Sequence, residues 1–101
     1  MSFRRRRYDE VVVRQLELFL AEDADLLDDV DRALERYNAA EAGEAEEVYG
    51  DYQRAIEAAT DRLGELRDAY ARTLEDSEAY VREFNSAVVK RWRALALTID
   101  E

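Results

Sequence analysis

Basic residues form two clusters that could bind phosphate groups. They are Arg4, Arg5, Arg6 and Arg7 next to the N-terminus, and Lys90, Arg91 and Arg93 around Trp92 near the C-terminus. Such cations neutralise phosphates, and an aromatic ring among them can stack on a base. As an alternative function, these clusters indicate a small nucleic-acid-associated protein that uses the N-terminal arginine arm. The acidity of the remaining chain opposes this, because it repels nucleic acid.

An acidic run is the only pattern that suggests a cation site. It comprises Glu22, Asp23, Asp25, Asp28, Asp29 and Asp31. Calcium loops need a turn-forming glycine and ligands at loop spacing, whereas carboxylates along a helix diverge over its surface. We therefore interpret the run as a solvated acidic face and expect no metal site.

The residues that are missing exclude most enzymatic chemistry. The chain has no cysteine and no histidine, so it has no disulfide, thiol nucleophile, imidazole ligand or Ser-His-Asp triad. Di-iron helical bundles need Glu-x-x-His pairs, which cannot occur here. We expect a non-enzymatic protein with no catalytic residue and no cofactor.

The composition is that of an all-α protein. Of the 101 residues, 40% are charged and none is proline, which is typical of long helices or coiled coils. The net charge is −10, and Lys90 is the only lysine. Two explanations fit this acidic, lysine-poor composition: codon use in a GC-rich genome, or adaptation to high salt, where charge repulsion is screened.

A first helix, helix A, is predicted over residues 8–40, after a flexible basic arm at 1–7. Its main apolar seam returns at steps of three and four: Val12, Leu16, Phe19, Asp23, Leu26, Val30, Ala33 and Tyr37. Asp23 is the polar exception, which is either the wet edge of the seam or a buried residue that fixes the register. A second row, Val13, Leu20, Leu27 and Leu34, makes the apolar face wide enough to touch more than one neighbour.

A turn at residues 41–43 should send the chain back as helix B, over residues 44–97. Asn38 and Gly43 are suited to ending a helix, and so short a connection makes the two helices antiparallel. Folding near residue 42 places Val30 near Ile56 and Phe19 near Leu66. These features predict a single-domain, coiled-coil-like antiparallel hairpin.

The apolar stripe of helix B changes phase at residues 73–77. Either the helix continues through a bend, or it breaks and a third helix begins. The absence of Gly, Pro or Asn between Arg72 and Val81 favours continuity.

The final segment, residues 77–99, extends beyond the reach of helix A and needs its own partner. Its apolar face supplies the predicted partner-binding residues Val81, Phe84, Val88, Trp92 and Leu95. We expect a second copy to cover this face in a dimeric four-helix arrangement, or a helical partner protein to do so. The alternative is a monomeric three-helix bundle. The predicted function is thus that of an interaction or scaffold module.

Two stretches of the sequence are candidates for a secretory signal or a membrane span, and neither has the required pattern. Only Tyr8 separates the four arginines from Asp9 and Glu10, so we expect that this stretch is not a secretory signal. The longest uncharged run near the C-terminus, residues 94–99, is too short to span a bilayer. A cytoplasmic location is expected.

Overall fold

The computed structural model describes residues 7–99, which fold into helices and short connections with no strand in that range. The elements are α1 (Asp9–Glu22), α2 (Ala24–Ala39), α3 (Ala45–Ala71), α4 (Glu78–Arg91), a 3₁₀ turn η1 (Arg93–Leu95) and α5 (Ala96–Ile99). Acidic residues in the first turns of α1 and α3, and basic ones in the last turn of α4, suit the helix dipoles. The all-α prediction is confirmed.

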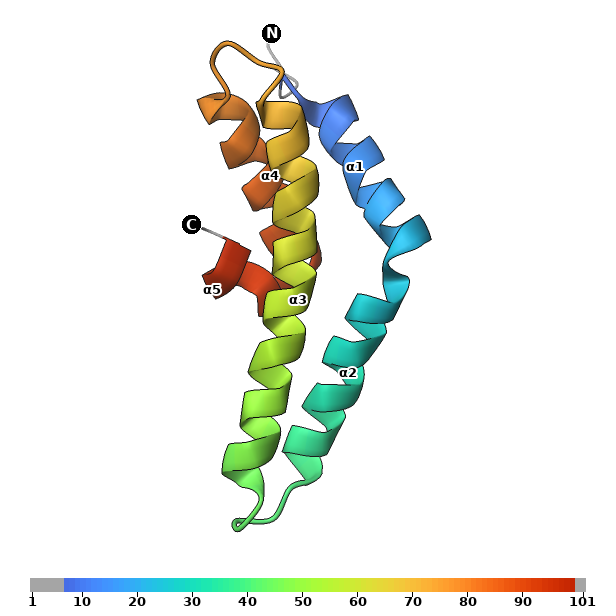
Figure 1. The fold of residues 1–101 in the computed structure, drawn as a ribbon, viewed down its shortest axis with the longest axis vertical. Coiled ribbons are helices and arrows are strands. Elements are labelled where there is room, and N and C mark those ends of the chain that lie inside the picture. The colour runs from blue at the N-terminus through green and yellow to red at the C-terminus, as the bar shows by residue number, and fades with distance from the viewer. Residues whose placement is uncertain (1–6, 100–101) are drawn as a thin grey trace, which may run out of the picture.

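The prediction of one helix over residues 8–40 is wrong, because the chain breaks at Asp23. That residue has φ −128° and ψ 26°, outside the helical range. Its carboxylate pairs with the Arg62 guanidinium of α3, with Nε and Oδ2 2.9 Å apart, and its side chain is largely buried. The break lets α1 tilt away from the line of α2 (Figure 1).

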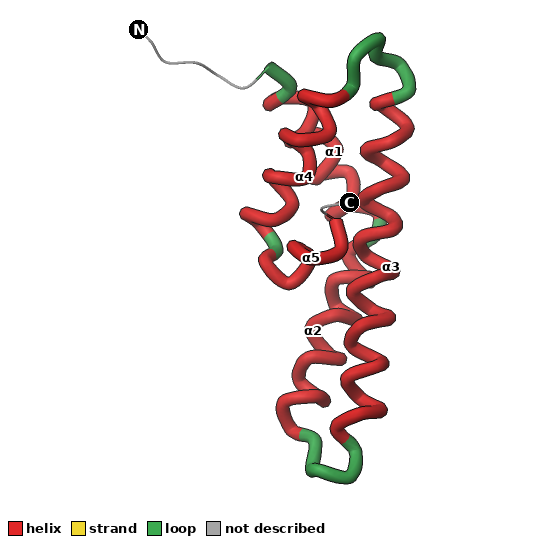
Figure 2. The backbone as a smooth tube through the Cα atoms, turned by 90° about the vertical axis from the view of Figure 1, so that its left-hand side faces the viewer, coloured by secondary structure: helices red, strands yellow, loops and turns green. Residues whose placement is uncertain are grey.

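The prediction of a continuous helix over residues 44–97 is also wrong. α3 ends at Ala71, and after residues 72–77 the chain turns back as α4, alongside α1 and α3 (Figures 1 and 2). Local bonds make the turn without Gly or Pro: the Thr73 hydroxyl donates to the Tyr70 carbonyl (2.7 Å), and Asp76 Oδ1 accepts from the Glu78 N–H (3.1 Å). Burial of the apolar face of α4 drives the reversal.

The molecule has two ends with different numbers of helices along its 54 Å axis. At the three-helix end, α1 and α4 pack with the part of α3 after Thr60. At the hairpin end (residues 24–60), α2 and α3 run antiparallel. Among the described residues, α5 reaches this pair only at Glu57 and Thr60, and no third helix lies beside it from there to the turn (Figures 1 and 2).

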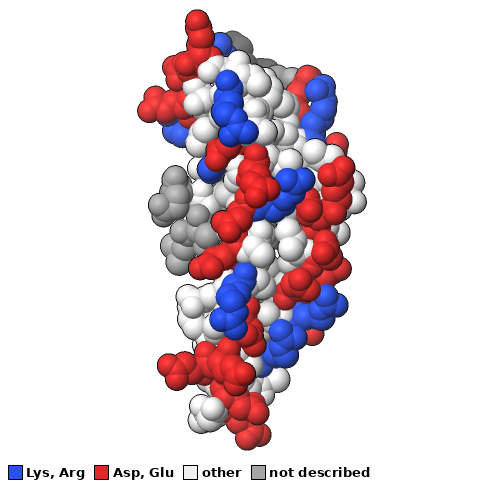
Figure 3. Space-filling view, viewed as in Figure 1, with Lys and Arg blue, Asp and Glu red and all other residues white. Residues whose placement is uncertain are grey.

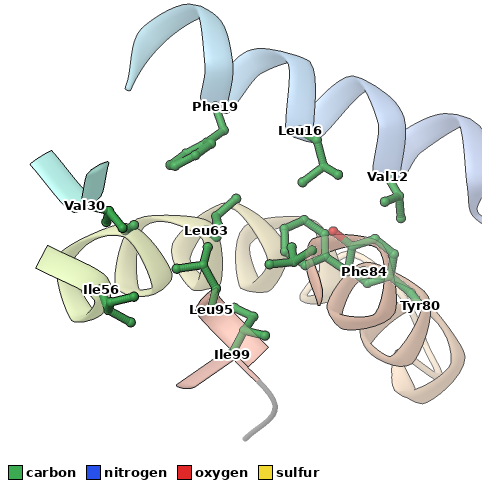
Figure 4. Close-up of a cluster of buried hydrophobic side chains, with 12 residues drawn as sticks. Val12, Leu16, Phe19, Val30, Ile56, Leu63, Tyr80, Phe84, Leu95 and Ile99 are labelled. Carbon is green, nitrogen blue, oxygen red and sulfur yellow. The ribbon is translucent and has the colours of Figure 1, made fainter. Parts of the chain in front are cut away.

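The core lies where the helices of the three-helix end meet. Phe19, Leu63, Tyr80 and Phe84 are completely buried, and Figure 4 shows side chains from α1, α3, α4 and α5 pointing toward one another. Val30 and Ile56 continue this core toward the hairpin end. Each fully buried side chain of this kind contributes roughly 1.5–3 kcal/mol.

Candidate partner-binding surface

The predicted partner-binding face of the last segment is mostly core. Phe84 and Val88 are 0% exposed and Leu95 is 1% exposed, while Val81 and Trp92 are half-buried. Trp92 packs edge-on against Phe19 of α1, with ring centroids 5.6 Å apart. The expectation that this face is open to a partner is therefore corrected, because the reversal at residues 72–77 covers it with the chain's own α1 and α3.

The two basic clusters are not brought together within the described residues. Arg4, Arg5 and Arg6 lie outside those residues, and the Arg7 guanidinium lies over the Tyr8 ring. Tyr8 contacts the first half of α4, since its N–H donates to Glu83 Oε1 (3.0 Å) and its ring meets Tyr80.

Lys90, Arg91 and Arg93 are exposed at the opposite end of α4, where Arg91 stacks on Trp92. Along the helix, Tyr80 and Arg91 are separated by about 16 Å. The predicted phosphate-binding residues thus form no common cation cluster with Arg7.

The acidic run is spread around the break between α1 and α2. Asp23 pairs with Arg62, and Asp29 pairs with Arg32 one turn along α2. In the part of the chain that the structure describes, no group of three or more acidic side chains is placed to hold a metal ion.

Tyr80 is the described titratable group with the largest change in acidity. Burial raises the pKa of its phenol to about 12, although the hydrogen bond to Gln15 partly opposes that rise. Because its side chain is fully buried and donates to Gln15 Oε1, Tyr80 holds α4 to α1.

Sequence reasoning did not identify the uncovered face at the hairpin end. We define the docking surface as Leu27, Leu34, Tyr37, Tyr49 and Tyr52. The three tyrosine rings pack on one another with centroids 5.4–6.5 Å apart, yet Tyr37 and Tyr49 remain 38% and 43% exposed. The two leucines are half-buried.

Helical spacing places Tyr49 on the same side of α3 that faces α4 at the three-helix end. Arg67 bonds Asn85 of α4 (3.0 Å), and Thr60 and Gln53 follow at seven-residue intervals on the same stripe. Tyr49 is one turn beyond Gln53, which donates to its hydroxyl. The line therefore runs from Arg67, beside α4, through the buried Thr60 to Gln53 and Tyr49, where it is exposed.

The opposite side of the hairpin end is charged. Arg32, Arg36 and Arg54 line a shallow hollow there with Asp29 and Asp51, to which Arg32 and Arg54 are paired. Leu34 comes two residues after Arg32, a rotation of about 200° that puts it on the other side of α2. The second row of helix A, including Leu27 and Leu34, was the sequence signal for this apolar side.

The charge of the molecule is concentrated at the same end. Residues 24–60 hold eleven acids and three bases, a net charge of −8 out of −10 for the whole chain. Figure 3 shows acidic atoms gathered over the tip of the hairpin.

Comparisons with protein-family models, curated protein sequences and solved structures give no match. Among the described helices, none combines the length and the apolar character that crossing a bilayer requires.

Proposed function

We propose that the protein is a non-enzymatic helical interaction module whose docking surface packs against a helix of another protein. One observation carries this proposal: the line covered by α4 at the three-helix end continues along α3 to Tyr49, where the described residues provide no covering helix. A partner helix bound there would be the third helix of a bundle with α2 and α3.

The composition of the docking surface supports this function. Tyrosine is enriched in protein interfaces and bears few rotatable bonds, so little entropy is lost when it is fixed. Leu27 and Leu34 add an aliphatic row one heptad apart, which suits an amphipathic helix with apolar residues at i, i+3 or i+4, and i+7.

Self-association is a second form of the same proposal. Two copies laid together by their docking surfaces would make a dimeric, coiled-coil-like four-helix arrangement. Analytical ultracentrifugation over a range of protein concentrations distinguishes a dimer from a monomer that awaits another protein.

The test of the helix-docking function is an NMR titration of the ¹⁵N-labelled chain with a stapled amphipathic helix whose polar face is uncharged. We expect amide shifts around Leu34 and Tyr49. Tyr49→Ser should weaken binding about tenfold, which corresponds to about 1.4 kcal/mol. The matched control is Val13→Ser, because Val13 is an equally exposed apolar residue at the other end of the molecule. Equal loss in both variants, or no binding together with no dimer, would contradict the proposal.

A further inference from the structure

We infer that the occupant of the docking surface is a basic amphipathic helix, with Lys or Arg along both edges of its apolar stripe. This inference rests on the proposed function and specifies its partner. It follows from how the charges are divided between the two sides of the hairpin end.

The edges of the docking surface are acidic on both helices. On α2, Asp31 lies one turn after Leu27 and one turn before Leu34; on α3, Glu46 lies one turn before Tyr49. Both carboxylates are exposed, and neither pairs with any of the described cations. A helix on this surface would place its flanking residues against them.

The three bases of the hairpin end cannot neutralise these edges. Arg32, Arg36 and Arg54 all line the hollow on the opposite side. Arg32 and Arg54 are already paired there with Asp29 and Asp51. The apolar side is therefore left with edges of one sign.

A second copy of the chain fits this surface less well than a basic helix. Two hairpin ends in contact would bring together two net charges of −8 and would set Asp31 and Glu46 against the same acids of the partner copy. Nucleic acid and anionic lipid carry the same sign as the surface and are repelled by it.

The tyrosines also favour cations. A guanidinium or ammonium group over an aromatic face within about 6 Å is attracted by the ring. The chain uses this contact elsewhere, with Arg7 5.4 Å from the Tyr8 centroid and Arg91 5.2 Å from the Trp92 centroid. The ten positions from Leu27 to Tyr37 span about 15 Å, so a partner helix of about three turns covers the surface.

The experiment compares three stapled helices with one shared apolar stripe and with Lys, Gln or Glu at the flanking positions. Stapling keeps their helicity equal, so that only charge differs. At low salt we expect the Lys helix to bind the full chain about tenfold more tightly than the Gln helix, the combined effect of exposed ion pairs with Asp31 and Glu46. Near molar salt, this advantage should disappear because such pairs are screened.

Variants assign that advantage to the docking surface. Asp31→Asn with Glu46→Gln should remove the preference for Lys and leave the affinity for the Gln helix unchanged. Glu75→Gln, an exposed acid in the connection at the opposite end of the molecule, is the control and should leave the preference intact.

Failure of the inference differs from failure of the proposed function. If the Lys and Gln helices bind equally well at the docking surface, the inference is overturned and the helix-docking function stands. A stable dimer formed through this surface, with the Lys helix excluded, also overturns the inference. If no helix binds there and the chain does not dimerise, both are wrong.

Discussion

The phenol of Tyr80 donates a hydrogen bond to Gln15 Oε1, which lies 65 positions earlier in the sequence. Gln15 in turn donates from Nε2 to the Leu66 carbonyl (3.0 Å), so one side chain joins α1, α3 and α4. Tyr80 is completely buried, and its ring contacts Tyr8, Tyr70 and Phe84. This polar contact inside the core fixes where α4 lies.

Stability should fall between pH 10 and about 12 because of Tyr80. Burial raises the pKa of its phenol from 10.0 to about 12, so the unfolded chain loses this proton first as pH rises. The stabilising effect is fully present below pH 10 and is lost as pH passes through the folded pKa. Urea unfolding from pH 8 to 12 tests this.

Tyr80→Phe is the control for that titration. Below pH 10 it should cost about 1 kcal/mol, because the hydrogen bond to Gln15 is lost. Above pH 10 its stability should decline less steeply than that of the unaltered chain. Parallel pH profiles for the two proteins would show that Tyr80 is not the titrating group.

Phe84→Ala should destabilise the folded chain by about 3–5 kcal/mol, since it empties a fully buried position between helices. Tyr49→Ala should cost about 1 kcal/mol or less, because that ring is exposed at the docking surface. Chemical unfolding at several protein concentrations provides the measurement. If Phe84→Ala hardly changed the free energy of unfolding at low protein concentration, α4 would not be packed against α1 and α3 of the same chain.

The Asp23–Arg62 pair should contribute more stability than the Asp29–Arg32 pair. The Asp23–Arg62 pair joins the break between α1 and α2 to α3 and is partly shielded from water. Both members of the Asp29–Arg32 pair are exposed and belong to the same helix. Double-mutant cycles with Asn at the acids and Gln at the arginines compare the two coupling energies. Equal couplings would remove the structural role assigned to Asp23.

Sodium chloride should raise the free energy of unfolding. From about 0.01 M to about 1 M salt, the screening length shrinks from about 30 Å to 3 Å, which weakens the repulsion within the hairpin end. Asp28→Asn with Glu47→Gln reduces its net charge and should flatten the response. Stability that is indifferent to salt would favour codon use as the explanation of the acidic composition.

The helical class and the turn near residue 42 followed from local patterns. The reversal at residues 72–77 did not, because Thr73 and Asp76 are weak stop signals and no Gly or Pro accompanies them. What favours the reversal is distant in sequence: Tyr80, Phe84 and Val88 become buried only when α1 and α3 lie beside them. Tertiary packing thus decided for a break at the residues where the apolar stripe only changed phase.

Asp23 and the docking surface show the same limit on a smaller scale. The seam marked Asp23 as an unusual polar position, but Arg62, its partner in α3, was visible only in the fold. The second apolar row required an additional neighbour for helix A. The row alone could not show that its members lie at different ends of the molecule. Leu20 lies at the three-helix end, beside the core residues of α1, whereas Leu34 lies at the hairpin end.

The uneven charge along the 54 Å axis makes the hairpin end the more negative end of the described part of the chain. Near a cationic partner, the electric field turns the elongated molecule before the two collide, so that the hairpin end with its net charge of −8 approaches first. Collisions become pre-oriented, and the association rate depends on ionic strength even for partners that bind weakly. Speed of encounter would then be set by residues that never touch the bound helix.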